Sequence, residues 1–179
     1  MSDLPNPMFP LSPVSLPRGS LHRQDGSAGA ARTTPGGCGV EVVWARHLDE
    51  VRQAQRLRYD VFVTEMGARL KSPLEGHDID VFDDYCEHLL VRDSGTGQAI
   101  GTYRVLTPEQ ARRAGSTYSD TEFDLTRLRD LRTRMVELGR SCVHAQHRHG
   151  GVIMALWGAL ADFMVRNQLD TMVGCASIP

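Results

Sequence analysis

From Met135 to Asn167 the chain reads MVELGRSCVHAQHRHGGVIMALWGALADFMVRN, and this stretch decides the fold. Apolar and β-branched residues at its start predict a buried strand. From Val152 onward, apolar residues recur three and four positions apart, which is the pattern of one helix face. The turn between them is rich in arginine, histidine and glycine. A glycine turn that opens a helix leaves backbone N–H groups free, and together with the helix dipole they suit a phosphate.

Two charges in the predicted strand need an explanation. Glu137 and Arg140 are three residues apart, so a regular strand would point them to opposite faces. A β-bulge at Gly139 would bring both to one face and separate the strand from its neighbour. The N–H groups freed by the bulge would then suit the oxyanion of an acyl-transfer reaction. An ion pair or edge charges in a plain strand explain the same residues equally well, and the spacing does not decide between these interpretations.

Three histidines follow the strand, at His144, His147 and His149. Their spacing matches no recognised zinc motif, and no cysteine or carboxylate completes a tetrahedral set, so we predict no metal site. A role for one of them as a proton carrier fits the pattern better.

Length and composition restrict the class of protein. A chain of 179 residues is long enough for one domain with a substantial core. Residues 1–39 are rich in Pro, Gly and Ser and are expected to form a disordered tail, and residues 40–179 the domain. A net charge of −2 argues against a nucleic-acid binder.

Cysteine spacing and hydropathy suggest the compartment. Four cysteines far apart favour reduced thiols over zinc ligands or a disulfide framework. No apolar run is long enough to span a bilayer. We therefore expect a cytoplasmic protein, with peripheral contact at the inner membrane surface as an open alternative.

The remaining periodic segments predict a sheet with two flanking helices. The sequence DSGTG at residues 93–97 is typical of a hairpin turn. In the first helix Arg58 and Phe62 share one face, and Arg104 lies in a strand that should be largely buried. Further strands are expected at 40–45, 88–92, 98–106 and 171–178, a helix at 47–66 and a short helix near 125–131.

Two charged regions connect these elements. The long acidic loop at 67–87 is typical of a functional connection; Asp80 and Asp83 would bind a cationic substrate or simply be solvated, and the sequence favours neither. The region 107–134 is expected to be irregular and polar, and its arginines suit an acidic partner, with plain solvation as the alternative. These arginines are Arg112, Arg113, Arg127, Arg129, Arg132 and Arg134.

The last predicted strand runs to Ile178, one residue before Pro179. Such a strand would leave a sheet edge uncovered. We expect the sheet to be completed by further strands or by a partner.

The order of these elements resembles the GCN5-related N-acetyltransferase fold. The residues are most similar to the branch with the ornithine acyl-carrier-protein N-acyltransferases, often labelled haemolysin-like, and the acyl-homoserine lactone synthases. The similarity extends from about Val40 onward. The matching segments are Leu57–Phe62, Glu65–Gly67, Asp80–Val91, Gly101–Leu106, Glu122–Leu125, Glu137–Val143, Leu156–Trp157 and Gly174–Ser177.

The resemblance implies an α/β (α+β) fold of the acyl-CoA N-acyltransferase type, a mixed sheet flanked by helices and here without its C-terminal strands. It implies transfer of a (3-hydroxy)fatty acyl chain from acyl carrier protein to the α-amine of ornithine, the first step of ornithine-lipid synthesis. The acyl carrier protein thioester is a co-substrate, and no permanently bound cofactor is implied.

The resemblance also implies which residues form the site. Glu137 would be the general base, with Gly139 and Arg140 beside it. The substrate would contact Arg58, Phe62, Asp80, Asp83 and Arg104. The phosphopantetheine phosphate would lie at the turn formed by Arg148, His149, Gly150 and Gly151.

Two departures from the lactone synthases favour the ornithine branch. Cys86 stands where those enzymes have an acid, and no tryptophan follows Gly67. Acyl transfer to another amino acid, or to the homoserine part of S-adenosylmethionine, is the first alternative. A membrane-active haemolysin-like binding protein is the second, and it would need an exposed amphipathic surface where the best helix has a core pattern.

Overall fold

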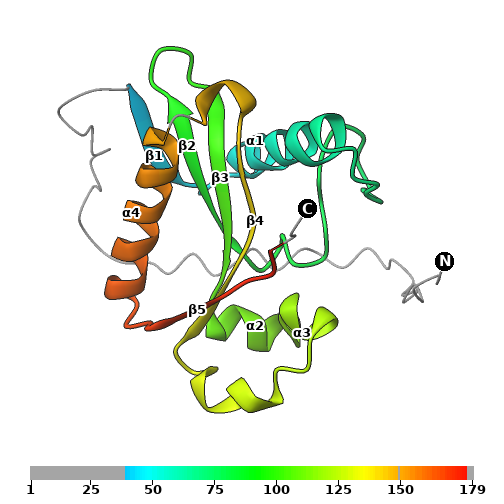
Figure 1. Ribbon diagram of the computed structural model, residues 1–179, viewed down its shortest axis with the longest axis vertical. Helices are drawn as coiled ribbons and strands as arrows, with labels where there is room; N and C mark the ends of the chain where they lie inside the picture. Colours follow the sequence, from blue (N-terminus) through cyan, green and yellow to red (C-terminus); the bar gives the residue numbers. More distant parts are fainter. Residues whose placement is uncertain (1–38, 149, 177–179) are drawn as a thin grey trace.

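The computed structural model describes residues 39–148 and 150–176 (Figure 1). Nearly all of the predicted N-terminal tail, residues 1–38, lies outside this part. The centre of the fold is one sheet with the strand order β1-β2-β3-β4-β5. Its strands are β1 (Val40–Trp44), β2 (Glu87–Asp93), β3 (Ala99–Leu106), β4 (Met135–Val143) and β5 (Thr171–Val173). The first three strand pairs are antiparallel and the β4–β5 pair is parallel, so the predicted mixed sheet is confirmed.

One long helix covers each face of the sheet (Figure 1). Helix α4 (Gly151–Arg166) buries Val152, Leu156 and Leu160 against the main core, whose sheet residues include Val91. Helix α1 (Leu48–Tyr59) packs on the other face, through a smaller cluster formed with Cys142 of β4. The alternating inward and outward side chains of the strands supply both clusters.

The predicted helix at 47–66 is confirmed, with a change of geometry near its end. Its N-terminus carries a capping box, in which the Glu50 carboxylate accepts from the His47 N–H at 3.2 Å. After Tyr59 the chain continues as a π-helix, η1 (Asp60–Glu65). π-helical turns are rare in proteins overall, and those that occur are often found at functional sites.

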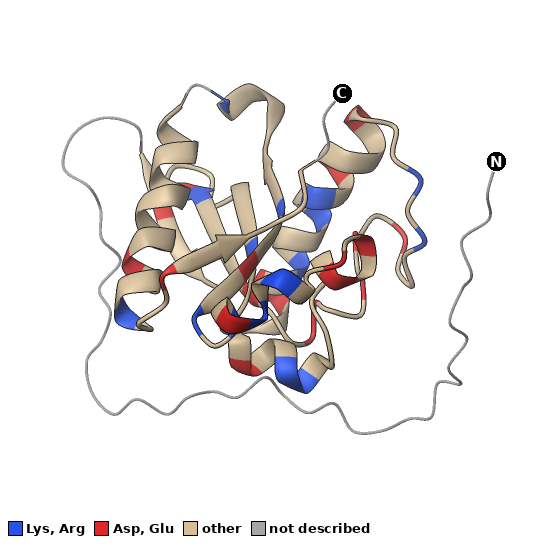
Figure 2. Cartoon of the chain, turned by 60° about the horizontal axis from the view of Figure 1, so that its bottom comes forward, with Lys and Arg blue, Asp and Glu red and all other residues tan. Residues whose placement is uncertain are grey.

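The region 107–134 is more regular than predicted. It contains α2 (Pro108–Ala114), α3 (Ser119–Glu122) and a 3₁₀ helix η2 (Thr126–Leu131), of which only the last was expected. A local signal for α2 was present, because Thr107 and Gln110 form a capping box around a proline at the first helical position. Helices α2 and α3 lie at the bottom of Figure 1, and Figure 2, in which the bottom is turned forward, shows blue segments, the colour of Lys and Arg, in this part of the molecule.

Of the two interpretations that the sequence left open, the structure shows the β-bulge, one position later than Gly139. Gly139 still pairs with Arg104 of β3, while Cys142 pairs with Thr102. Strand β4 therefore has one residue more than β3 in this interval, and Arg140 adopts the left-handed conformation with φ 50°.

Strand β5 leaves β4 early. Its pairing ends at Glu137 opposite Val173, although β4 continues to Val143. The predicted strand at 171–178 is thus too long, since β5 ends at residue 173 and residues 177–179 lie outside the described part. Within residues 39–148 and 150–176, no helix has the length and apolar character needed to cross a membrane.

Candidate active site

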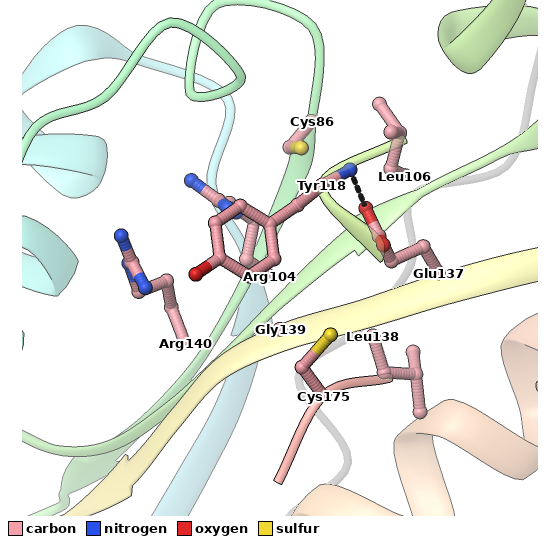
Figure 3. Close-up of a pocket in the computed structure, with 9 residues that line it drawn as sticks. All are labelled: Cys86, Arg104, Leu106, Tyr118, Glu137, Leu138, Gly139, Arg140 and Cys175. Atoms are coloured by element: carbon pink, nitrogen blue, oxygen red, sulfur yellow. Dashed lines mark hydrogen bonds between the residues drawn. The ribbon is translucent and has the colours of Figure 1, made fainter. Parts of the chain in front are cut away.

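A pocket lies where β4 continues beyond its pairing with β5 (Figure 3). Both Glu137 and Arg140 line it, so the bulge does bring the two strand charges to one side. The pocket is lined by Cys86, Arg104, Leu106, Tyr118, Glu137, Leu138, Gly139, Arg140 and Cys175.

Glu137 is held firmly in the wall of the pocket. Only 6% of the residue is exposed. Its Oε1 accepts hydrogen bonds from the Ser119 N–H at 2.6 Å and from Ser119 Oγ at 2.5 Å, and its Oε2 accepts from the Tyr118 N–H at 2.8 Å. The start of α3 therefore fixes the carboxylate. Oε2 has a single donor within the described residues, which leaves one acceptor position on it.

Three arginines and three aspartates form a closed circle of ion pairs, which we call the charge ring and which shares Arg104 and Arg140 with the pocket wall. Each charge contacts two of opposite sign, at N–O distances between 2.5 and 3.2 Å. The order around the ring is Arg58, Asp83, Arg104, Asp80, Arg140, Asp78 and back to Arg58.

The ring is buried on one side and partly open on the other. Arg58 is fully buried and Asp83 is 5% exposed, whereas the side chains of Asp80 and Arg140 are each 23% exposed. Burial acts to raise the pKa of Asp83, but Arg58 and Arg104 outweigh it and hold that pKa well below its ordinary range. Asp78 behaves differently, because burial outweighs its arginine neighbours and raises its pKa.

The five predicted substrate contacts lie in three different places. Arg104 lines the pocket, and Asp80 contacts it at 2.5 Å from the open side of the ring. Arg58 and Asp83 lie beneath them in the buried part. Phe62 is not in the pocket wall, because it packs on the cluster around Cys142.

The predicted phosphate turn lies at the start of α4. Arg148 donates two hydrogen bonds to the Glu65 carboxylate, at 2.6 and 2.7 Å, and its Nε donates to the Val143 carbonyl at 3.1 Å. Gly150 has φ 92° and precedes Gly151, the first residue of α4, which has no side-chain cap. His149 lies outside the described residues.

Of the other two histidines, neither lines the pocket. His144 Nδ1 accepts from the Gln146 N–H at 3.3 Å, and the His144 and His147 rings lie 5.6 Å apart. The part of the chain that the structure describes contains no cluster of three or more residues suited to hold a metal ion.

The sequence did not single out Tyr118, Ser119 or Cys175 as residues of the site. Tyr118 and Ser119 hold Glu137 from 19 and 18 residues away; Tyr118 is the N-cap and Ser119 the first residue of α3, a helix of only four residues. The Cys175 Sγ donates to Ser119 Oγ at 3.5 Å, across 56 residues. No local pattern signals such contacts, and Cys175 lay inside the strand predicted at 171–178, whereas β5 ends at Val173.

Comparison with known proteins gives a consistent result. A family model described as acetyltransferase (GNAT) domain matches residues 57–158. The L-ornithine N(alpha)-acyltransferase of Rhodobacter capsulatus is 40% identical over 146 residues, which cover 76% of this chain and 56% of that protein. The protein of the same name from Brucella abortus is 40% identical over 77% of this chain and 52% of its own length. The chain thus spans about half the length of the curated relatives it matches.

Solved structures agree on the fold. The coenzyme A-dependent acyl-homoserine lactone synthase BjaI, with SAM and isopentyl-CoA, has a TM-score of 0.58 at 22% identity, covering 77% of this chain and 66% of that chain. The lactone synthase LasI has a TM-score of 0.55 at 18% identity, covering 77% and 72%. Because the family model matches residues 57–158 of the 179, this chain belongs to the GNAT acetyltransferase domain family.

Proposed function

We propose that this protein is an N-acyltransferase that moves a (3-hydroxy)fatty acyl chain from acyl carrier protein to the α-amine of ornithine. The observation that carries the proposal is the placement of Glu137, fixed by α3 in the wall of a pocket that opens where β5 leaves β4. Similarity to proteins named L-ornithine N(alpha)-acyltransferase, at 40% identity, supports the choice of acceptor.

The chemistry requires a neutral amine to attack the carbonyl carbon of a thioester. Glu137 accepts the proton of that amine at the remaining acceptor position of Oε2, directly or through a water molecule. Negative charge then develops on the carbonyl oxygen. Backbone N–H groups of β4 around Gly139 and Arg140, beyond the last pair with β5, stabilise this oxyanion.

Ornithine would be bound by the open side of the charge ring. Asp80 offers a partly exposed carboxylate for the side-chain ammonium of ornithine, and Arg140 a partly exposed guanidinium for its carboxylate. Asp83 does not contact ornithine itself. Its role is to hold Arg58 and Arg104 in place through ion pairs beneath the site. Phe62 contributes packing beneath the site.

The donor would approach from the side of α4. Arg148, His149, Gly150 and Gly151 bind the phosphate of phosphopantetheine at the start of this helix. Arg148 then exchanges the Glu65 carboxylate for the phosphate. The carrier protein is acidic and docks on exposed arginines of α2 and η2, of which Arg112 and Arg127 are examples.

The direct test mixes the purified protein with 3-hydroxyacyl carrier protein and ornithine. We expect acyl-ornithine, detected by mass spectrometry, with free carrier protein as the second product. The same assay with other amino acids and with S-adenosylmethionine distinguishes the alternative acceptors. Failure to form any acyl-amine, with carrier protein, chain length and acceptor all varied, would refute the proposal.

The docking surface can be tested separately. Replacing both Arg112 and Arg127 by glutamate should raise KM for the acyl carrier protein with little change in kcat, and the effect should shrink as salt screens the charges. Arg166→Glu, at the exposed end of α4, is the matched control. An equal KM for the double variant and the control would remove this surface from the proposal.

A further inference from the structure

Tyr118 contacts two charged side chains of the pocket in two different ways. Its backbone N–H donates to Glu137 Oε2 at 2.8 Å, and its ring lies against the guanidinium of Arg140, with 5.6 Å between the ring centroid and Cζ. Figure 3 shows the ring between these two side chains. Glu137 is the group proposed above to take the proton of the amine, and Arg140 the group proposed to bind the carboxylate. One residue therefore contacts both.

The guanidinium of Arg140 is supported on one edge only by ion pairs. Its Nε lies 3.1 Å from Asp78 and its Nη2 lies 3.2 Å from Asp80, while no hydrogen bond to Nη1 is present within the described residues. The backbone of Arg140 has φ 50°, in the left-handed region that residues other than glycine rarely adopt. The edge at Nη1 is therefore open to a carboxylate, and the Tyr118 ring limits the movement of the guanidinium.

The Tyr118 ring is itself held by an aromatic neighbour. Phe82 of the acidic loop is 8% exposed and meets the Tyr118 ring edge to face, with 6.3 Å between centroids and 86° between planes. The Phe82 ring also lies 5.9 Å from Cζ of Arg104. Each arginine of the pocket wall thus contacts one aromatic ring. A ring face attracts a guanidinium and orients it without neutralising its charge.

The backbone of Tyr118 is fixed by contacts that do not involve its side chain. Tyr118 is the N-cap of α3, and the N–H and hydroxyl of Thr117 donate to the Asp120 carboxylate at 3.1 and 2.8 Å. Arg132 donates two hydrogen bonds to the same carboxylate, at 2.9 and 2.5 Å. A replacement of the Tyr118 side chain therefore leaves in place the N–H that binds Glu137.

The hydroxyl of Tyr118 has a separate partner. Burial raises its pKa, and the hydrogen bond with Glu122 acts in the same direction, so the hydroxyl stays neutral and adds no charge beside Arg140. Any role in orienting the guanidinium thus belongs to the ring, which phenylalanine also supplies.

We propose that Tyr118, through its ring, is a positioning residue for Arg140 and thereby sets the selectivity of the site for acceptors that carry an α-carboxylate. This proposal rests on the acyltransferase function proposed above. The ring holds the guanidinium so that Nη1 meets the carboxylate of ornithine. Because the carboxylate and the α-amine share one carbon, this contact presents the α-amine to Glu137 rather than the amine of the side chain.

The test compares ornithine with 1,4-diaminobutane, which is ornithine without its carboxylate. In Tyr118→Leu, KM for ornithine should rise about three- to tenfold, as for the loss of one cation–π contact. Because the N–H on Glu137 remains, kcat should change less than about twofold, and KM for the acyl donor should stay the same. The preference for ornithine over 1,4-diaminobutane, measured as a ratio of kcat/KM, should fall by the same factor as KM for ornithine rises.

Three further variants separate the ring from other causes. Tyr118→Phe keeps the ring and should recover the wild-type KM for ornithine. Phe123→Leu is the matched control, because Phe123 is an exposed aromatic residue at the C-cap of α3 and outside the pocket wall. In an Arg140→Met background, Tyr118→Leu should raise KM no further, since its effect passes through the guanidinium. Circular dichroism checks folding, and Tyr118→Met takes the place of Tyr118→Leu if the leucine variant does not fold.

The outcomes distinguish this proposal from the proposed function. If the wild-type protein forms acyl-ornithine and Tyr118→Leu keeps the wild-type KM for ornithine, the role of Tyr118 is overturned and the proposed function stands. The same holds if KM for ornithine and for 1,4-diaminobutane rise equally, or if Tyr118→Phe loses as much as Tyr118→Leu. If the wild-type protein acylates no amine, both proposals fail.

Discussion

Glu137 has two roles at the scale of a single residue. Its carboxylate accepts three hydrogen bonds that attach α3 to β4, and the same group faces the pocket. These donors hold the side chain in one orientation, so the remaining acceptor position on Oε2 needs no rotation to reach a substrate. Position and proton transfer therefore depend on the same two oxygen atoms.

Glu137→Gln should accordingly affect both activity and stability. Turnover should fall by roughly 10²–10⁴-fold if the carboxylate is the base. The free energy of unfolding should fall by about 1–3 kcal/mol, because the amide NH₂ would face an N–H donor in a buried site. Initial rates and urea unfolding measure the two effects. Glu109→Gln, exposed in α2, is the control, and unchanged turnover in Glu137→Gln would exclude it as the base.

His88 gives a second prediction at this scale. It is 3% exposed, and its Nε2 lies 3.1 Å from the Asp83 carbonyl oxygen. Burial lowers its pKa, and the nearby Asp83 only partly opposes this. Below a pH of about 6.5 the unfolded chain binds a proton that the folded chain does not. The free energy of unfolding should therefore decrease as the pH is lowered, by up to about 1.4 kcal/mol per pH unit.

Urea unfolding between pH 7 and pH 5 tests this prediction. His88→Gln can still donate a hydrogen bond from its amide and cannot titrate in this range, so its stability should depend less on pH. Asp83 contributes only at lower pH, since its pKa is depressed from the ordinary acidic value. Equal slopes for the wild-type protein and His88→Gln would contradict the assignment.

At the scale of elements, the contact between α4 and β3 depends on one missing side chain. A Cβ at Gly101 would lie 2.5 Å from Val152 Cγ1, so α4 can approach the sheet only because residue 101 is glycine. Gly158 lies on the outer side of the same helix, with no atom within 4 Å of a Cβ built there. Gly101 thus lies in the interface between α4 and the sheet, whereas Gly158 lies on the exposed side of α4.

These environments predict opposite effects of alanine. Gly101→Ala should lower the free energy of unfolding by about 1–3 kcal/mol, because α4 must shift outward. Gly158→Ala should raise it by about 0.5–1 kcal/mol, because alanine is the better helix former. Thermal unfolding of both variants measures the difference. A Gly101→Ala variant with a higher free energy of unfolding than the wild-type protein would contradict this prediction, because α4 would then shift outward without loss of stability.

Local patterns were sufficient for most of these elements. Residues close in sequence predicted the hairpin, α1, α4 and the charged strand. The same local pattern also singled out Glu137 and Arg140 as charges that a buried strand does not normally contain. The bulge was one of two interpretations that the sequence left open, and that interpretation placed it one residue early. A glycine marks where a strand can bend, while the pairing of Gly139 with Arg104 decides where the extra residue goes. Helix α2 was missed although its capping box is local.

The site was less predictable than the fold for a physical reason. The contacts of Ser119 with Glu137 and with Cys175 span 18 and 56 residues. They depend on how a polar, four-residue helix is placed against β4, and no periodicity encodes that placement. The aspartates of the acidic loop were noticed, but their arrangement in a ring with three arginines from separate elements was not.

At the scale of the whole molecule, the charge ring joins four parts of the chain. Arg58 comes from α1, Arg104 from β3, Arg140 from β4, and the three aspartates from the acidic loop. A buried ion pair adds little over apolar packing, but removal of one partner leaves the other uncompensated. The ring is therefore sensitive to partial loss.

Arg58→Met should show this sensitivity. It leaves Asp78 and Asp83 without one of their two cations and should lower the free energy of unfolding by about 3–5 kcal/mol. Arg129→Ala removes an exposed ion pair with Asp130 and should cause no measurable change. Chemical denaturation compares the two variants. Similar stabilities would mean that the ring contributes nothing to folding.

The closed form of the charge ring also has an evolutionary consequence. Every member contacts two neighbours of opposite sign, so any single replacement that removes a charge creates a local imbalance, which a second replacement can relieve. Mutational effects at these six positions should be strongly epistatic. Diverging lineages are then expected to keep the six residues as one inherited set or to replace several of them together, and intermediates with five should be rare.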